Sequence, residues 1–136
     1  MDMQLTAIGR VRSPLTDADS APKQGDEGAP QATIVLEAEL LPALEGVAAG
    51  DHVLVFTWLD RAARDVLTVH PRGDLSRPPA GVFATRSPHR PNPIGLHRVE
   101  VVAIDGTELT VRDLEALDGT PVVDIKPVLS ADAADR

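Results

Sequence analysis

Residues 85–98 hold the side chains of this protein that are best suited to catalysis or ligand binding. Their sequence is Thr-Arg-Ser-Pro-His-Arg-Pro-Asn-Pro-Ile-Gly-Leu-His-Arg, with three arginines, two histidines and no carboxylate. Three prolines fix φ and remove backbone N–H groups, so we predict a rigid loop that is neither helix nor central strand. Guanidinium groups bind carboxylates and phosphates through paired N–H donors. The stretch predicts an anion-binding loop around Arg86 and Arg90. Pairing of these arginines with the chain's own carboxylates explains the pattern equally well.

A second candidate site surrounds the turn Asp118-Gly119, within the sequence Glu-Ala-Leu-Asp-Gly-Thr-Pro of residues 115–121. A carboxylate held at such a turn can accept hydrogen bonds from a ribose diol or an amino group. Asp also caps its own backbone in ordinary turns, and the residue pattern alone favours that simpler interpretation. Asp124 and Lys126 lie two residues apart, so in a strand they share a face and can form an ion pair.

Composition limits the partners that the chain can bind. The 136 residues include 21 acidic and 13 basic side chains, which gives a formal net charge of −8. This charge excludes strong, sequence-independent binding to a polyanion, so any contact with nucleic acid must be local. Two Phe and one Trp are too few for an aromatic platform that stacks bases. The chain has no cysteine, and its four histidines are not at metal-ligand spacing, so we predict no metal site.

Alternating apolar residues predict an all-β protein with a single domain over residues 1–136. We expect strands at residues 5–11, 34–40, 52–59, 66–69, 82–84, 98–104, 108–111 and 122–125. Asp105-Gly106 predicts a hairpin turn, and residues 42–47 predict about one helical turn. Residues 13–31 and 72–80 are expected to form long loops, and residues 130–136 a frayed tail. The pattern favours a small closed or nearly closed β-barrel of about seven short strands with long functional loops.

The chain ends and the longest apolar runs bear on localisation. The first residues, Met-Asp-Met-Gln-Leu, lack the basic start and apolar run of a signal peptide. No apolar stretch reaches the roughly 18 residues needed to cross a membrane. We therefore expect a cytoplasmic protein that does not engage a membrane and has no C-terminal extension domain.

Two long motifs give the chain a family resemblance. Residues 85–96 and the later Asp-Gly-Thr-Pro-Val-Val-Asp-Ile-Lys-Pro at 118–127 resemble the TsaA-like family, also called TrmO, VirR or YaeB. Ile-Gly-Arg-Val-Arg-Ser-Pro at 8–14 and Pro-Lys-Gln at 22–24 are similar to its N-terminal signature. The resemblance implies a homodimeric β-barrel methyltransferase that binds S-adenosylmethionine near its dimer interface. The implied methyl acceptor is N6 of threonylcarbamoyl-adenosine at position 37 of tRNA.

The same resemblance implies roles for individual residues. Its S-adenosylmethionine contacts fall on Lys23, Gln24, Gly25, Leu59, Asp60, Arg86, Leu96, Glu115, Ala116, Leu117 and Asp118. Asp118 or Asp124 is the candidate acceptor for the N6 proton, a catalytic role. Arg90, Asn92 and Lys126 are the candidate substrate contacts, with Arg90 facing the threonyl carboxylate.

Two alternatives remain open. The chain could be a non-catalytic barrel that binds S-adenosylmethionine or a nucleotide and acts as a sensor or adaptor. It could also be a methyltransferase of the same fold that acts on a small molecule. Turnover on RNA separates the enzyme that we predict from both alternatives.

Overall fold

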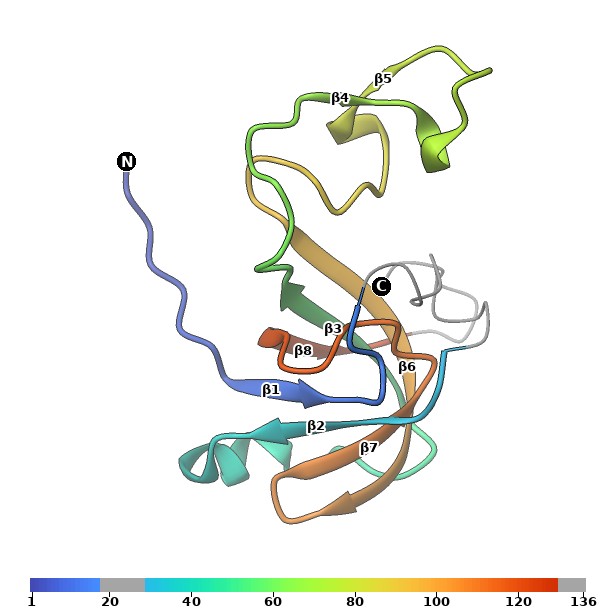
Figure 1. Ribbon diagram of the computed structural model, residues 1–136. Helices are drawn as coiled ribbons and strands as arrows, with labels where there is room; N and C mark the ends of the chain where they lie inside the picture. The colour runs from blue at the N-terminus through green and yellow to red at the C-terminus, as the bar shows by residue number, and fades with distance from the viewer. Residues whose placement is uncertain (18–28, 130–136) are drawn as a thin grey trace.

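Six antiparallel strands close into a barrel in the computed structural model, which describes residues 1–17 and 29–129 (Figure 1). The order around the barrel is β1-β2-β7-β6-β3-β8, and β8 pairs back with β1. The barrel strands are β1 Gly9–Arg12, β2 Ala32–Leu36, β3 His52–Trp58, β6 Ile94–Asp105, β7 Glu108–Arg112 and β8 Pro121–Pro127. The prediction of an all-β, closed or nearly closed barrel is therefore confirmed, with six strands in the barrel where about seven were expected. The prediction of a frayed tail at 130–136 lies outside the described residues.

The barrel interior is filled by aliphatic side chains from one face of each strand. In β6, for example, Val99 and Val101 are buried while their neighbours are partly exposed, as the two-residue period of a strand requires. The core has no aromatic side chain, so Val, Leu, Ile and Ala supply its bulk. It consists of Val11, Ala32, Ile34, Leu36, Leu44, Val53, Val55, Val99, Val101, Leu109, Val111, Leu114, Ala116 and Val122.

The strand β6 begins earlier than predicted. It starts at Ile94, directly after Pro93, and pairs with β3 on one side and β7 on the other. The prediction that residues 85–98 contain no central strand was therefore wrong for residues 94–97, since a strand was expected from residue 98 onward. None of these four residues is a proline, so each keeps its backbone N–H, and that of Ile94 donates to the carbonyl of Asn92. The proline-rich loop and a central barrel strand are thus directly joined.

Two predicted strands are wholly or partly 3₁₀ helix instead. The alternation over residues 34–40 is a strand only as far as Leu36, and Ala38–Leu44 forms the 3₁₀ helix η2. Residues Val82–Ala84 form the 3₁₀ turn η4, with Val82 buried. Short apolar runs fit a strand and a single helical turn equally well, so their period could not distinguish the two.

The remaining boundaries differ by a few residues. The first strand begins at Gly9 rather than Leu5. The hairpin after β6 is where it was predicted, but Asp105 pairs with Glu108, so the loop residues are Gly106 and Thr107. Gly106 has φ of 60°, a left-handed conformation that glycine adopts without strain.

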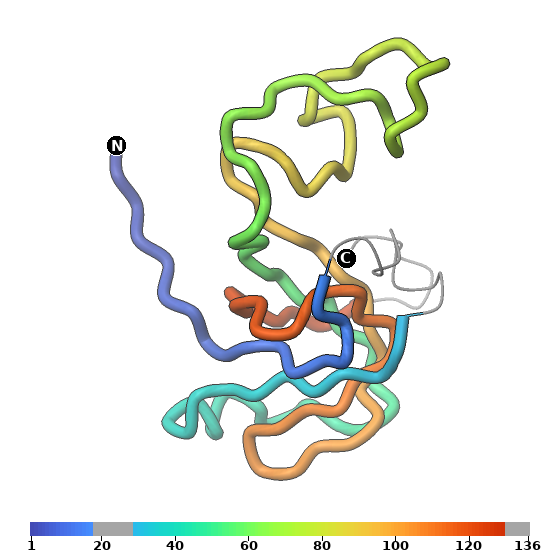
Figure 2. The backbone as a smooth tube through the Cα atoms, viewed as in Figure 1, coloured from blue at the N-terminus to red at the C-terminus, as the bar shows by residue number. Residues whose placement is uncertain are grey.

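Residues 59–93, which we call the arm, project away from the barrel between β3 and β6 (Figure 2). The arm holds a separate two-stranded sheet of β4, Thr68–Val69, and β5, Ala80–Gly81, and the 3₁₀ turn η3, Pro71–Gly73. The strand expected at 66–69 is therefore shorter and lies outside the barrel. Hydrogen bonds from the side chain and backbone of Ser76 hold the pKa of Asp74 below its ordinary value. No helix in residues 1–17 or 29–129 is long and apolar enough to span a membrane.

Candidate ligand-binding site

A cavity of about 330 Å³ lies where the arm joins the barrel. Four segments that are distant in sequence form its walls: residues 59–62 after β3, residues 86–90 of the arm, the start of β6, and the segment between β7 and β8. The barrel order brings these segments together because the whole of β3 pairs with the first part of β6, so the end of β3 lies beside the start of β6. The cavity wall mixes aliphatic side chains with arginines, histidines and carboxylates.

Most of the predicted ligand contacts in the described residues line this cavity. They are Leu59, Asp60, Arg86, Arg90, Leu96, Glu115, Ala116 and Leu117. The predicted contacts Lys23, Gln24 and Gly25 lie outside the described residues. Asp118, Asn92, Asp124 and Lys126 are absent from the cavity lining.

Arg90 lines the cavity, but its guanidinium is engaged by the protein's own backbone. Nη1 donates to the carbonyl oxygens of Thr85 at 3.1 Å and Ser87 at 3.0 Å, and Nη2 donates to that of Val82 at 2.8 Å. These acceptors are neutral carbonyls rather than carboxylates. Arg90 therefore braces the loop that carries Arg86, a role that the sequence did not indicate.

The proline-rich loop is also tied to the segment that follows β3. The amide of Ala63 donates to Nδ1 of His89 at 3.0 Å, and the amide of Arg90 donates to the carbonyl of Ala63 at 3.0 Å. Arg64 donates to the carbonyl of Pro91 at 2.7 Å and to Oδ1 of Asn92 at 2.9 Å. These bonds fix one cavity wall against another, and they place the side chain of Asn92 on Arg64.

A cation–π contact adds to this junction between the loop and β3. The guanidinium carbon of Arg64 lies 5.1 Å from the centroid of the Trp58 ring, at the end of β3. Such contacts contribute about 0.5–1 kcal/mol at exposed sites. Arg64 thus stacks on the last residue of β3 while it holds the loop that leads into β6.

The acidic turn is tied to the start of the early loop. Oδ1 of Asp118 accepts a hydrogen bond from the amide of Ser13 at 3.0 Å, and the amide of Asp118 donates to the carbonyl of Leu15 at 2.7 Å. Arg61, on the cavity wall, donates to the carbonyl of Thr16 at 2.9 Å. The carboxylate of Asp118 therefore positions the backbone leading into the early loop, close to the cavity but not in its wall.

Asp124 and Lys126 form the ion pair that their spacing allows. Nζ of Lys126 lies 3.5 Å from Oδ2 of Asp124, and both side chains are at least half exposed on β8. Oδ1 of Asp124 also accepts from the amide of Ile125 at 2.8 Å. Both predicted roles, catalytic for Asp124 and substrate-binding for Lys126, therefore fall on a solvent-facing pair away from the cavity lining.

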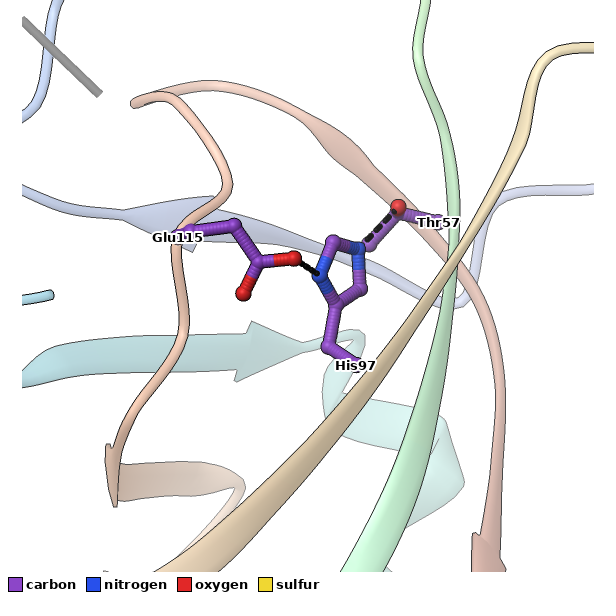
Figure 3. Close-up of polar contacts among 3 residues, drawn as sticks. All are labelled: Thr57, His97 and Glu115. Atoms are coloured by element: carbon purple, nitrogen blue, oxygen red, sulfur yellow. Dashed lines mark hydrogen bonds and ion pairs between the residues drawn. The ribbon is translucent and has the colours of Figure 1, made fainter. Parts of the chain in front are cut away.

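The sequence did not single out the cavity's buried polar network of Thr57, His97 and Glu115. Oγ1 of Thr57 lies 2.7 Å from Nε2 of His97, and Nδ1 of His97 lies 2.5 Å from Oε1 of Glu115 (Figure 3). Thr57 is fully buried, and the side chains of His97 and Glu115 are 4% and 17% exposed. His97 and Glu115 both line the cavity, so the network connects the barrel core to the ligand-binding space.

A signal for His97 was present in the sequence. Val99 and Val101 alternate as inward-facing residues, and the same two-residue period continued backwards places His97 and Gly95 on the inner face. We expected no strand in the proline-rich stretch, so the two-residue period was not continued back to these two residues. Over residues 1–17 and 29–129, no three His, Cys, Asp or Glu side chains are grouped so that they could hold a metal ion.

Comparison with known proteins identifies the family of this barrel. The family model of the tRNA-methyltransferase O N-terminal domain matches residues 10–133. The chain belongs to this family, as its motifs predicted. A probable S-adenosyl-L-methionine-binding protein from Methanothermobacter thermautotrophicus is 45% identical over 127 residues, covering 93% of this chain and 90% of the relative.

Other relatives are longer than this chain. A probable S-adenosyl-L-methionine-binding protein from Archaeoglobus fulgidus is 49% identical over 130 residues, which cover 96% of this chain and 35% of the relative. A crystal structure of TrmO from Pseudomonas aeruginosa matches with a TM-score of 0.78 and 33% identity, covering 98% of this chain and 58% of that chain. The chain thus spans about a third of the first protein and over half of the second.

Proposed function

We propose that this chain is an S-adenosylmethionine-dependent methyltransferase whose acceptor is N6 of threonylcarbamoyl-adenosine at position 37 of tRNA. The observation that carries the proposal is the convergence of predicted donor contacts on one cavity. Seven of the eight such residues in the described ranges line it: Leu59, Asp60, Arg86, Leu96, Glu115, Ala116 and Leu117. The family supports a tRNA methyltransferase, and the names of the relatives support S-adenosylmethionine as the ligand.

The cavity suits the donor in size and in chemistry. Its volume of about 330 Å³ lies at the lower end of the range typical of small-molecule sites. Leu59, Leu96 and Leu117 offer apolar contacts to an adenosine. Arg86 and Glu115, which line the cavity from different segments, offer the opposite charges that an amino-acid zwitterion requires.

S-adenosylmethionine supplies the methyl group from a sulfonium, which leaves as a neutral thioether. The protein's contribution is then to align donor and acceptor and to exclude water, which can lower a barrier by several kcal/mol. The acceptor N6 must also lose its proton. Within the described residues, Asp60 and Glu115 are the carboxylates on the cavity wall, and Asp60 is the exposed one. We therefore move the proton-accepting role from Asp118 and Asp124 to Asp60.

The distribution of charge supports an RNA substrate. The arm, residues 59–93, carries six of the chain's 13 basic side chains but three of its 21 acidic ones. The arm therefore has a formal charge of +3, and the rest of the chain has −11. A cationic arm beside the cavity can contact phosphates locally while the acidic barrel is repelled, so binding is restricted to one face.

We also propose that two copies associate through the arm. Leu67, Leu75 and Phe83 are 66%, 80% and 84% exposed, and all three lie on the arm. Burying apolar surface of this kind favours association, and like copies commonly pair symmetrically. Light scattering at micromolar concentration should give twice the chain mass of 14.4 kDa. A mass of 14.4 kDa would contradict the dimer.

A second candidate is a barrel that binds S-adenosylmethionine without turnover. The relatives from both archaea are named for binding rather than for catalysis, which favours keeping this candidate. Both functions require the donor to bind, and only the enzyme transfers the methyl group.

Two measurements test the proposal in sequence. Calorimetry of the full chain with S-adenosylmethionine should show saturable binding, and a flat titration with folded protein would remove both candidates. Radiolabelled methyl transfer should then appear on tRNA that carries threonylcarbamoyl-adenosine and not on the matching unmodified tRNA. Binding without transfer to either tRNA would favour the non-catalytic candidate.

A further inference from the structure

The Thr57–His97–Glu115 network is placed by strand register. Thr57 pairs with Gly95, and Val55 pairs with His97, so Thr57 and His97 are diagonal neighbours on the inner face of β3 and β6. A Cβ on Gly95 would approach Oγ1 of Thr57 and Nε2 of His97 closer than 3.0 Å. Glycine at position 95 therefore leaves the space in which the Thr57–His97 hydrogen bond forms.

One set of donors and acceptors satisfies both hydrogen bonds through a singly protonated imidazole. In that set Nδ1 of His97 donates to the carboxylate of Glu115, which is an acceptor group. Nε2 of the same ring then carries a lone pair and accepts a hydrogen bond from the hydroxyl of Thr57. Each donor then meets one acceptor, and no buried side-chain N or O atom in the described residues lacks a partner.

The network interrupts an otherwise aliphatic stripe. The next inward-facing residues on the same strands are Val55 and Val99, which are 0% and 1% exposed. Valines at positions 57 and 97 would continue that core without burying polar groups. Burying a polar group costs free energy unless the group is hydrogen-bonded. Thr57 and His97 lie where the core meets the cavity. The network ends at the carboxylate of Glu115, which lines the cavity.

Glu115 is constrained from both sides. Its neighbours Leu114 and Ala116 are buried in the core, which fixes the backbone. His97 then fixes the side chain by holding Oε1, and Figure 3 shows the second carboxylate oxygen directed away from the imidazole. A carboxylate held in this way contacts a ligand without first losing its rotamer freedom, so less binding free energy is lost to ordering.

We infer that Thr57 and His97 are positioning residues that act on ligand binding through Glu115, whose fixed carboxylate accepts hydrogen bonds from the methyl donor. This inference rests on the proposed function, because it takes S-adenosylmethionine as the ligand. Thr57 does not itself line the cavity. Its effect on affinity must therefore pass through the imidazole.

A double-mutant cycle tests this dependence. Thr57→Val keeps the β-branched shape but leaves Nε2 of His97 without its donor, and Glu115→Gln removes the carboxylate's charge while keeping an oxygen for Nδ1. By calorimetry, Glu115→Gln should weaken S-adenosylmethionine binding about 10- to 30-fold, as expected for a hydrogen bond to a charged group. Thr57→Val should weaken it about fivefold in the parent and less than twofold when Glu115 is already Gln.

Two controls separate positioning from loss of structure. Glu100→Gln changes a carboxylate on β6 that pairs with Arg112 at 3.3 Å and does not line the cavity. This variant should leave the affinity for S-adenosylmethionine unchanged. Nitrogen-15 NMR of the histidine rings should show the Nδ1-protonated tautomer for His97 in the parent. Thr57→Val should keep this tautomer, because Glu115 still accepts from Nδ1, and should shift the Nε2 resonance, which loses its donor.

The outcomes are distinguishable. An equal loss of affinity from Thr57→Val in both backgrounds, or no loss in the parent, would overturn the positioning role while the proposed function stands. An Nε2-protonated His97 in the parent would overturn it as well. Failure of the parent to bind S-adenosylmethionine would end the proposed function together with this inference.

Discussion

Nη2 of Arg90 donates a 2.8 Å hydrogen bond to the carbonyl oxygen of Val82, across eight residues of the arm. The same guanidinium also donates to the carbonyl oxygens of Thr85 and Ser87, so it holds the loop around Arg86 in one conformation. The sequence predicted that Arg90 binds an anion, but in the structure Arg90 stabilises the cavity wall. Arg90 therefore contributes both positive charge and rigidity to the loop.

Arg90→Ala should therefore reduce both stability and ligand affinity. Removal of three charge-assisted hydrogen bonds should lower the free energy of unfolding by about 2–3 kcal/mol, measured by urea denaturation. S-adenosylmethionine affinity should fall with it, because Arg86 loses its support. Arg112→Ala is the matched control, since Arg112 is half exposed in a single surface ion pair and should cost under about 1 kcal/mol. Unchanged stability in Arg90→Ala would show that the loop does not need the brace.

Gly95→Ala should destabilise the barrel at the Thr57–His97 pair. The added Cβ would lie within 3.0 Å of both polar atoms, and neither can recede through the packed core. We expect a loss of about 1–3 kcal/mol in thermal or urea unfolding. Gly81→Ala is the control, because Gly81 has φ of −63° and open space around its Cβ position. Equal stability of the two variants would refute the steric argument.

Arg77→Ala should weaken tRNA binding without changing affinity for the methyl donor. Arg77 is exposed on the arm and is absent from the cavity lining, and its carbonyl rather than its side chain bonds to His70. Loss of one phosphate contact should reduce the slope of log affinity against log salt by about one. Filter binding over a range of salt concentrations measures this slope. Arg112→Ala, on the barrel, should leave it unchanged, and an equal effect of the two variants would contradict docking on the arm.

Asp60→Asn should separate catalysis from donor binding. Asparagine has nearly the same shape as aspartate, so the variant keeps the shape of the cavity. It cannot accept the N6 proton, so it lacks the proposed base. The rate of methyl transfer should fall about 10²- to 10⁴-fold, the contribution typical of general base catalysis. Asp60 is also a predicted donor contact, so calorimetry should show S-adenosylmethionine affinity reduced by no more than about tenfold, because asparagine keeps an oxygen that can accept a hydrogen bond. Methyl transfer at the parental rate would exclude Asp60 as the base.

Several features of the fold followed from local patterns. Alternating apolar residues indicated β2, because a half-buried strand must repeat every two residues. A continuous apolar run indicated β3, in which three consecutive residues are buried. The end of β6 was marked by Asp105-Gly106, since a hairpin needs residues that tolerate a tight turn. Short apolar runs such as Val82–Ala84 were assigned wrongly, because a single 3₁₀ turn buries its residues as well as a strand does.

The sequence by itself determined the family, the barrel class and most of the residues that meet at the cavity, because these depend on local motifs and on residue order. Only the tertiary structure decided how those residues are used. Thr57 and His97 are 40 residues apart, so their contact depends on the register of β3 against β6. Glu115 is 18 residues beyond His97, and its contact depends on where the segment between β7 and β8 packs. Arg90 bonds to carbonyls that no composition rule would select. Hydrogen-bond partners across a barrel are set by strand pairing and loop docking, which local sequence does not encode.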